Sequence, residues 1–285
     1  MSKNLSESII EKSLLITALL SIILIFTILF FILNESLPLF EEYNFIQFLF
    51  GFNWLPDKGI YGVFPMIIGS LSITLFSLIL SAPLGILCAI FMAEVANDRI
   101  KNFLKPVIQT LSGIPSVVYG FFGLTILVPT VRSIFGGTGF SIFTAGIILA
   151  IMILPTIISV SLDSILSVQQ EFREASLGLG ATQWQTIKNI ILPIALPGLI
   201  TAIILSFSRA IGETLAVIMI AGNVAKIPHS LFDPVRTLTS NIGLEMSYAT
   251  GIHHNALFAT GIVLFITIII LLLITKYIQK KYKTI

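Results

Sequence analysis

The chain has 285 residues, of which 56% are hydrophobic and only 11% are charged. A soluble domain usually carries about 25% charged residues, so this composition excludes an ordinary soluble domain and predicts an all-α integral membrane protein. The net charge of +2 is too small to indicate nucleic-acid binding. The single cysteine, Cys88, excludes a disulfide framework and a cysteine-based metal site, and we expect it to be a small buried side chain.

Six apolar stretches are long enough to span a bilayer as helices. They are expected at residues 14–33, 65–93, 106–128, 141–160, 193–221 and 256–275. The first is long for a signal peptide and is not followed by a small-residue cleavage site, so we expect an uncleaved first helix. The second is expected to be interrupted at Pro83-Leu84-Gly85. The chain then divides into a first helix with its connection, a transmembrane domain and a basic tail, at residues 1–64, 65–275 and 276–285.

The distribution of Lys and Arg predicts the orientation, because basic residues concentrate on the cytoplasmic side of membrane proteins. Six spans put both termini on one side of the membrane. That side would hold eleven basic residues: Lys3, Lys12, Arg99, Lys101, Lys105, Arg173, Lys188, Lys276, Lys280, Lys281 and Lys283. The other side would hold four: Lys58, Arg132, Lys226 and Arg236. Both termini are therefore expected in the cytoplasm, and the connections at 34–64 and 222–255 outside.

The two outward connections carry aromatic and histidine residues. Trp54-Leu55-Pro56 is expected to anchor the first connection at the membrane interface. Three histidines, His229, His253 and His254, fall in the second connection. Two adjacent histidines have poor spacing for metal ligands on one helix, so we predict a solvated loop and no metal site.

The segment 161–193 is too polar to span the membrane. Its first part shows helical spacing of apolar residues, Gly178 and Gly180 then break the helix, and Thr182 with Gln185 has the spacing of a capping box before a second short helix. The second helix carries three large apolar residues: Trp184, Ile187 and Ile191. The pattern leaves two interpretations open, which are insertion into a groove on another protein and an amphipathic segment lying on the membrane surface.

A resemblance favours insertion into a partner. The spacing of Glu174-Ala175-Ser176, Gly180, Ile190 and Leu192-Pro193 matches the EAA loop of ABC-importer permeases, with Ser in place of the third-position Ala. The resemblance implies that this EAA segment (residues 161–193) docks on a nucleotide-binding ATPase. The coupling residues it implies are Glu174, Ala175, Ser176, Gly180, Ile190, Leu192 and Pro193. Because the chain has no G-x-x-x-x-G-K-[ST] phosphate loop, ATP and Mg are expected on the partner ATPase, and we expect no cofactor or enzyme activity in this chain.

The fifth apolar stretch carries two charged residues, Arg209 and Glu213. An arginine at the centre of a membrane helix costs about 2.5–3.5 kcal/mol on insertion scales, so Arg209 is expected to face a polar path or a partner group. Glu213 follows one helical turn later and is expected on the same face. One interpretation is a pair that only stabilises the bundle. The other is an anion path, in which the planar guanidinium of Arg209 binds an oxyanion. In that interpretation Glu213 weakens this binding enough for the anion to be released.

Other polar residues within the spans are candidates for lining such a path. They are Ser116, Tyr119 and Thr214, with Ser70 and Thr74 as further candidates. Ser116 and Tyr119 are flanked by Pro115 and Gly120, which permit kinks and close helix approach.

A second resemblance covers nearly the whole chain. RAIGETLAVIMIAGN (209–223), GIPSVVYGFFG (113–123), and Trp54-Leu55-Pro56 with the following Tyr61-Gly62 and Pro65 resemble PstC-type permeases of the phosphate-specific ABC importer. The resemblance implies a six-helix type I importer permease that translocates inorganic phosphate, with Arg209 and Glu213 as the translocation residues. It also implies a heterodimer with a PstA-like permease, a PstB-like ATPase dimer and a PstS-like phosphate-binding protein.

Other functions are weighed against this one. A permease of the same class for molybdate, tungstate or sulfate would share the EAA segment. A secondary transporter or channel would keep moving its substrate after removal of the ATPase. The chain contains no G-x-S-x-G, no H-E-x-x-H and no paired intramembrane aspartates, which argues against an intramembrane enzyme.

Overall fold

The computed structural model describes residues 5–282, with side chains described at 10–274, 276 and 277. Five long helices form most of the described structure. They are α1 (Leu5–Glu42), α3 (Phe64–Ile90), α7 (Ile142–Leu166), α10 (Leu192–Ile211) and α13 (Ile252–Tyr282).

Shorter elements extend or connect these helices. The short α-helices are α2 (Phe45–Phe50), α4 (Asp98–Gly113), α5 (Ser116–Phe122), α6 (Val128–Phe135), α8 (Gln170–Gly178), α9 (Gln183–Thr186), α11 (Leu215–Ile220) and α12 (Leu238–Glu245). Three π-helical turns follow α3, α5 and α9 within the described residues: η2 (Phe91–Val95), η3 (Gly123–Leu127) and η4 (Ile187–Ile191). A small antiparallel hairpin pairs β1 (Trp54–Leu55) with β2 (Ile60–Tyr61) across the 3₁₀ turn η1 (Pro56–Lys58), with Trp54 opposite Tyr61.

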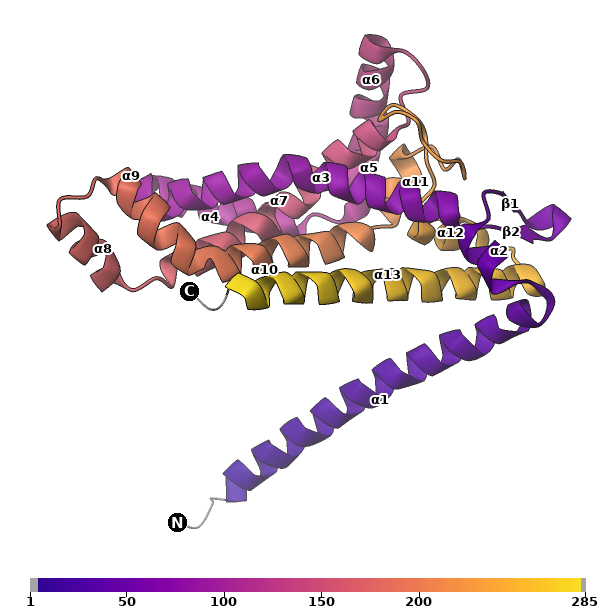
Figure 1. Cartoon of the computed structure of the whole chain (residues 1–285), viewed down its shortest axis with the longest axis horizontal. Helices are drawn as coiled ribbons and strands as arrows, with labels where there is room; N and C mark the ends of the chain where they lie inside the picture. Colours follow the sequence, from indigo (N-terminus) through magenta and orange to yellow (C-terminus); the bar gives the residue numbers. More distant parts are fainter. Residues whose placement is uncertain (1–4, 283–285) are drawn as a thin grey trace.

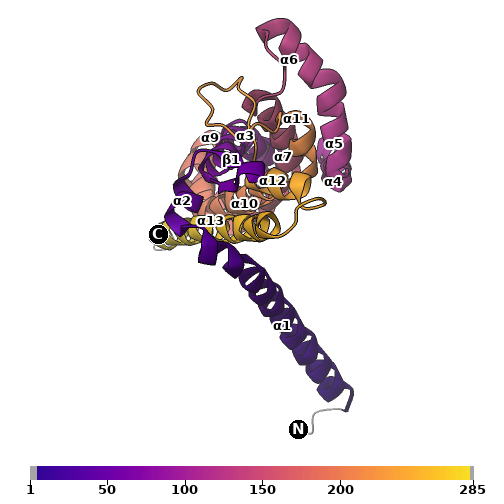
Figure 2. The ribbon, with the colours of Figure 1, turned by 90° about the vertical axis from the view of Figure 1, so that its right-hand side faces the viewer.

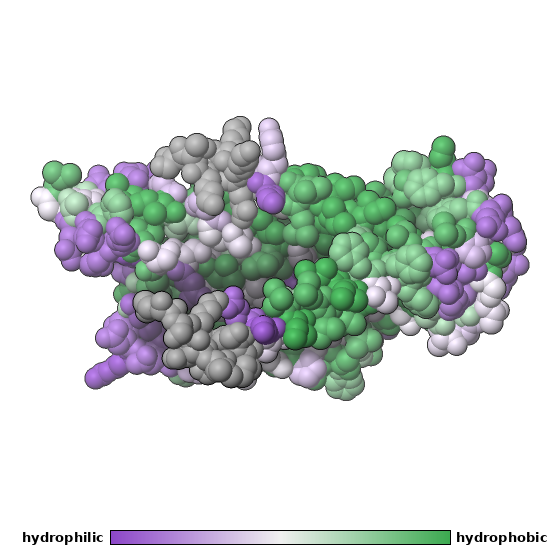
Figure 3. Space-filling model, turned by 90° about the horizontal axis from the view of Figure 1, so that it is seen from below, coloured by the Kyte–Doolittle hydropathy of each residue, from purple (hydrophilic) through white to green (hydrophobic). Residues whose placement is uncertain are grey.

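The helices form an elongated bundle. In Figure 1, α3, α7, α10 and α13 run side by side along the long axis. The segment with α8 and α9 lies at one end, together with the end of α13, and the hairpin with α2 and α12 lies at the other end. Figure 3 shows that much of the surface between these two ends is hydrophobic, whereas hydrophilic residues gather at the ends. This distribution is the one expected of a protein that crosses a bilayer.

α7 is the central helix of the bundle and packs against both α3 and α10. Its Ile148, Ile153 and Ile157 are fully buried, as expected for a helix that is apolar on all sides. Gly85 brings α3 close to α7, because a Cβ at this position would lie 2.6 Å from Cγ2 of Ile157. Small residues at such contacts let membrane helices approach closely.

The described part of the chain contains six helices that are long and apolar enough to cross a membrane, which confirms the predicted number. They are Ile10–Glu42, Phe64–Val95, Ser116–Phe135, Ile142–Leu166, Gln183–Ile211 and Ile252–Ile274. The short hairpin is the one departure from an all-helical architecture in the described residues.

Several predicted span ends are wrong. The third predicted span, 106–128, begins inside α4, and the apolar helix starts only at Ser116 because Ile114 and Pro115 adopt extended backbone between α4 and α5. The fifth span begins at Gln183, since α9, η4 and α10 are continuous, and it ends at Ile211 rather than near residue 221. Hydropathy alone does not register either break.

Other boundaries differ for related reasons. The predicted interruption of the second span at Pro83 is wrong, because Pro83 lies inside the continuous helix α3, a position that membrane helices tolerate. Residues 34–42, predicted as connection, continue α1, and the predicted tail from 276 to 282 continues α13. The remaining tail residues, 283–285, lie outside the described residues.

α1 diverges from the rest of the bundle, as Figures 1 and 2 both show. It contacts α13 through the ring pair Phe31–Phe258, at 5.6 Å between centroids. Near its C-terminal end, the backbone carbonyl of Glu35 accepts a hydrogen bond of 2.6 Å from Nδ2 of Asn255. None of the most apolar 18-residue window of α1 is buried. Lipid or another protein must therefore cover most of this helix.

Candidate functional site

The EAA segment forms two helices joined by a glycine turn, as predicted. α8 ends at Gly178, and Gly180 adopts φ +86°, a left-handed conformation that favours glycine. The predicted capping box is confirmed: Thr182 Oγ1 accepts from the backbone N–H of Gln185 at 3.3 Å, and Gln185 Oε1 accepts from the backbone N–H of Thr182 at 2.8 Å. Residues 161–166, however, belong to α7, so the predicted first helix is split at Ser167–Gln169.

The apolar side chains of the EAA segment serve two purposes. Ile187 and Ile191, predicted to present themselves to a partner, are instead buried against Ile165 and Val168 at the end of the bundle. The large exposed side chains are Phe172, Leu177, Leu179 and Trp184. The buried pair holds the segment on the bundle, and the exposed set is free to contact another protein.

The predicted coupling residues lie along this surface. Glu174, Ala175, Gly180 and Pro193 are exposed, whereas Ser176, Ile190 and Leu192 are half-buried. The hydroxyl groups of Ser176 and Thr186 form a hydrogen bond of 2.9 Å that joins α8 to α9. The Ser at the third EAA position therefore contributes a contact that Ala cannot make.

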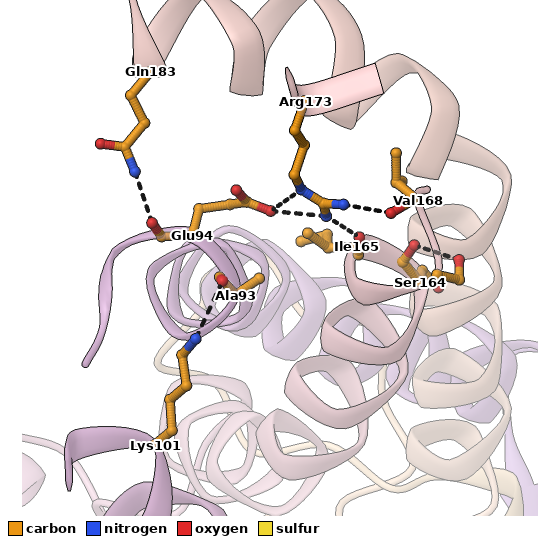
Figure 4. A network of polar contacts seen from close by, with 9 residues as sticks. Ala93, Glu94, Lys101, Ser164, Ile165, Val168, Arg173 and Gln183 are labelled. Atoms are coloured by element: carbon orange, nitrogen blue, oxygen red, sulfur yellow. Dashed lines mark hydrogen bonds and ion pairs between the residues drawn. The ribbon is translucent and has the colours of Figure 1, made fainter. Parts of the chain in front are cut away.

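Arg173 fastens the EAA segment to the bundle, a role that the sequence analysis missed. Figure 4 shows its guanidinium directed at Glu94, where Nη2 lies 3.0 Å and Nε 3.3 Å from Oε1. Arg173 also donates to two carbonyls at the end of α7, to Ile165 at 2.9 Å and to Val168. A cation near a helix C-terminus interacts favourably with the carbonyl groups that have no hydrogen-bond partner within the helix. One side chain thus joins α8, η2 and the end of α7.

A second contact strengthens this connection. Nε2 of Gln183 donates to the backbone carbonyl of Glu94 at 2.7 Å (Figure 4). Both short helices of the EAA segment, α8 and α9, therefore attach to the end of the second span. One feature of the sequence could have indicated this role of Arg173, because it is a single basic residue within two turns of the C-terminus of an apolar helix.

Arg209 and Glu213 lie on either side of a helix break. Arg209 is exposed in the last turn of α10, and the helix ends at Gly212. Oε1 of Glu213 accepts a hydrogen bond from the backbone N–H of Ala216 at 3.2 Å, at the start of α11. The prediction that the two side chains share one helical face is therefore wrong, and no ion pair joins these two described residues. Glu213 satisfies an N–H of the next helix instead.

A hydrogen bond from a neighbouring helix stabilises the break between α10 and α11. The backbone carbonyl of Glu213 accepts from Oγ1 of Thr239, in α12, at 2.8 Å. Thr214 is half-buried and its hydroxyl donates to the carbonyl of Gly212 at 3.3 Å. Glu213 and Thr214 thus lie in an irregular stretch directly after α10, the helix that carries Arg209, and membrane proteins tolerate such a stretch only where it is covered by protein or lines a polar cavity.

Tyr119 connects this stretch to the third span. It is buried, its hydroxyl donates to the carbonyl of Leu111 at 2.9 Å, and it packs in the same buried cluster as Ala210, the residue after Arg209. Gly120, the next residue, lets α5 pack on α11, because a Cβ there would lie 2.9 Å from Cα of Ala216. Half-buried Ser116 lies one turn before Tyr119 on α5. The α5–α11 contact thus joins the helix that carries Ser116 and Tyr119 to the helix that follows Glu213 and Thr214.

Ser70 and Thr74, the two further candidates for lining the path, are both enclosed within the protein. The hydroxyl of Ser70 accepts from the backbone N–H of Leu238 at 2.9 Å, which ties α12 to α3. Thr74 is almost completely buried in α3. Neither side chain faces open space in this conformation. Cys88, expected to be buried, is half-buried and has a free thiol.

The two connections predicted to face outward form a polar cluster around Glu245, which the sequence did not indicate. Its carboxylate accepts from Trp54 Nε1 at 2.8 Å, pairs with Arg236 Nη1 at 2.6 Å and lies 2.9 Å from His253 Nε2. Trp54 is buried, so its predicted role as an interfacial anchor is wrong. His253 and His254 lie half-buried in α13, so only exposed His229 fits the predicted solvated loop. No group of three or more metal-ligating side chains occurs in the described residues.

Replacing Glu245 with Ala is expected to lower the melting temperature of the purified protein. The variant removes the carboxylate that accepts from buried Trp54 and contacts half-buried Arg236 and His253, although Arg236 keeps its hydrogen bonds to Asn241 and Asn223. Breaking a buried ion pair costs about 3–5 kcal/mol. Glu245→Gln keeps one acceptor oxygen and is expected to lose less. Thermal unfolding of both variants checks this, with exposed Glu41→Ala as the control. Equal melting temperatures for Glu245→Ala and Glu41→Ala would contradict the stabilising role of the cluster.

The comparisons with known proteins identify the family. Residues 81–284 match the family described as binding-protein-dependent transport system inner membrane component. The chain belongs to this family. It is therefore a multi-pass transport component of the cytoplasmic membrane.

Relatives cover most of the chain. It is 45% identical to the probable ABC transporter permease protein YqgH of Bacillus subtilis, over 84% of this chain and 79% of that protein. It is 33% identical to the phosphate transport system permease protein PstC of Haemophilus influenzae, over 98% of this chain and 95% of that protein. A chain of the bacterial alginate ABC transporter shares the fold, with a TM-score of 0.66, 18% identity and 98% of both chains covered. The fold is thus that of a type I ABC importer permease, as predicted.

Proposed function

We propose that this chain is the membrane permease subunit of an ATP-driven importer that moves inorganic phosphate inward across the cytoplasmic membrane. The observation that carries the proposal is the likeness to proteins named PstC over almost the full length of the chain. The exposed Arg209 at an intramembrane helix break supports it, because a guanidinium suits a tetrahedral oxyanion.

The proposed orientation places both termini and the EAA segment in the cytoplasm. Eleven basic residues against four favour it. The arrangement in Figure 1 agrees, since the start of α1 and the end of α13 point to the end of the bundle where α8 and α9 lie. The Glu245 cluster then lies at the outer face.

The proposed partners are the proteins that hydrolyse ATP, complete the membrane part and deliver the substrate. The EAA segment presents exposed Phe172, Leu177 and Trp184 to a PstB-like ATPase dimer, which binds ATP and Mg. A PstA-like permease completes the membrane part as a heterodimer, and a PstS-like binding protein delivers phosphate to the outer face. ATP binding closes the ATPase dimer, the EAA segment transmits the movement, and the bundle alternates between outward and inward openings that differ in affinity for the anion.

Competition for uptake tests the substrate. Vesicles that hold the complete complex take up labelled phosphate in the presence of excess unlabelled sulfate or molybdate. We expect phosphate uptake to continue under both conditions and to fall only with unlabelled phosphate. Uptake of labelled molybdate or sulfate without uptake of phosphate would overturn the substrate while leaving the importer class in place.

Glu213→Gln tests the proposed selectivity. A protonated phosphate has an O–H donor that sulfate lacks, and the carboxylate of Glu213 would accept it. Gln retains an oxygen for the N–H of Ala216, so the start of α11 should persist. A hydrogen bond to a charged group contributes about 1.5–3 kcal/mol, so preference for phosphate over sulfate is expected to fall roughly tenfold. Full discrimination by this variant, measured by uptake of both anions, would remove Glu213 from selectivity.

A further inference from the structure

α4 carries a continuous polar stripe that the site described above does not use. Its polar residues recur every three or four positions, the repeat of one helical face. They are Asn102, Lys105, Gln109 and Ser112 on α4, and Ser116 begins α5 beyond the extended residues Ile114 and Pro115. The four residues on α4 are exposed. Asp98 continues the face into the first turn, where its charge is favoured by the helix dipole.

Two other faces of α4 carry large apolar residues. Leu104 and Ile108 pack against α7, in a cluster with Ile158 and Leu162. Phe103 is 70% exposed and Val107 is 41% exposed, and helical geometry places them almost opposite Lys105 and Gln109. One helix therefore has a buried face, an exposed apolar face and an exposed polar stripe.

This polar stripe lies at membrane depth. α4 runs alongside α7 within the bundle (Figure 1), and Leu104 contacts the cluster that contains Leu162, close to the end of α7 at Leu166. Gln109 is about 6 Å further along the helix than Lys105, and Ser112 about 10 Å further, at 1.5 Å per residue. Polar side chains at such depth rarely face lipid, and typically face a bundle interior or a water-filled cavity.

The deep end of the stripe meets the Arg209 site. The carbonyl of Leu111, next to Ser112, accepts the hydrogen bond from Tyr119, and Tyr119 packs in the same buried cluster as Ala210, the residue after Arg209. Ser116 begins the helix that carries Tyr119. Near the other end, Lys101, one turn before Lys105, donates to the carbonyl of Ala93 at 3.5 Å, next to Glu94, which pairs with Arg173 of the EAA segment. The stripe thus leads from Arg209 to the face of the protein that carries the EAA segment.

We propose that this stripe lines the inner half of the phosphate path, with Lys105 as the cation near its cytoplasmic mouth. The proposal rests on the proposed function. Amide and hydroxyl groups of Asn102, Gln109 and Ser112 offer neutral donors to an oxyanion, which hold it less tightly than a guanidinium does. A phosphate leaving Arg209 then passes weaker sites toward Lys105, whose charge raises the local anion concentration.

Cysteine reactivity tests the path. In the complete complex with Cys88→Ser, the variants Gln109→Cys and Ser112→Cys are compared with Phe103→Cys and Val107→Cys on the opposite face of the same helix. A membrane-impermeant, negatively charged methanethiosulfonate is added on the EAA side. Without nucleotide, positions 109 and 112 are expected to react about tenfold faster, because only thiolate reacts and an apolar environment disfavours it. A non-hydrolysable ATP analogue should slow that reaction by closing the inner opening.

Lys105 provides an independent readout. Lys105→Gln is expected to lower phosphate uptake about tenfold, the lower end of the enrichment produced by a charged cleft, and Lys105→Arg should restore it. Arg99→Gln, on the same helix but off the stripe, is the matched control. ATPase activity and assembly are expected to stay at the native level in all three variants.

The outcomes separate this inference from the proposed function. Unreactive cysteines at 109 and 112 in a complex that imports phosphate would overturn the stripe alone, and would indicate that a partner permease covers it. Reactive cysteines in a complex that moves another anion would retain the stripe as a path and overturn the substrate. Equal reaction rates on both faces of α4, with native uptake by Lys105→Gln, would also overturn the inference.

Discussion

Replacing Arg209 with Gln is expected to lower phosphate uptake strongly while assembly and ATPase activity persist. Arg209 is exposed in the last turn of α10 and no ion pair joins it to Glu213, so its loss leaves no buried carboxylate unpaired. A hydrogen bond to a charged group contributes about 1.5–3 kcal/mol, and each 1.36 kcal/mol corresponds to about tenfold in rate. We therefore expect uptake to fall roughly 10- to 100-fold.

Two companion variants sharpen this prediction. Arg209→Lys keeps the charge but loses the planar fork of donors, so intermediate uptake is expected. Arg132→Gln removes an exposed arginine from α6, outside the proposed path, and should transport normally. Labelled phosphate uptake in vesicles, with ATPase activity measured on the same preparation, distinguishes the variants. Native uptake by Arg209→Gln would make Arg209 a structural residue.

Replacing Arg173 with Ala is expected to lower the amount of phosphate transported per ATP hydrolysed. Arg173 joins α8 to Glu94 and to the last carbonyls of α7, and both side chains of the pair are largely enclosed, at 13% and 11% exposed. Without it, α8 keeps its exposed contact surface for the ATPase but loses its attachment to the second and fourth spans. Coupling free energies of about 1–3 kcal/mol correspond to 5- to 150-fold, so the ratio should fall by roughly tenfold or more.

Controls for Arg173 come from the same network. Glu94→Gln retains an acceptor oxygen but removes the ion pair, so a smaller loss is expected. Lys188→Gln removes an exposed cation from η4 and should leave the ratio unchanged. Crosslinking between the EAA segment and the ATPase should survive in all three variants. A native ratio of transport to hydrolysis in Arg173→Ala would show that the pair holds the fold without transmitting movement.

The parts of the structure that depend on local sequence were predictable. The number of spans follows from apolar length, and the capping box of Thr182 and Gln185 follows from a spacing of three residues. Which side chains of the EAA segment are exposed was predictable from the sequence only in part. Ile187, Ile191 and Trp184 are all large side chains on one short amphipathic stretch, and packing against Ile165 decides that the two isoleucines are buried.

The parts that depend on distant contacts were not predictable. Arg173 and Glu94 are 79 positions apart, and Trp54 and Glu245 are 191 apart, so nothing in either local sequence identifies the partner. The break at Gly212 was hidden for a different reason. The flanking residues are apolar and read as one helix, whereas Glu213 uses its carboxylate to start α11 and thereby divides it.

If ATP hydrolysis by a partner drives phosphate through this chain, phosphate should accumulate inside the vesicle against its own concentration gradient. Proteoliposomes are prepared with this chain, its partner permease, the ATPase dimer and the binding protein, and labelled phosphate is supplied on the binding-protein side. We predict that phosphate accumulates above its external concentration only when ATP is present on the EAA side. Equilibration of phosphate without ATP, or accumulation without the ATPase, would contradict the account.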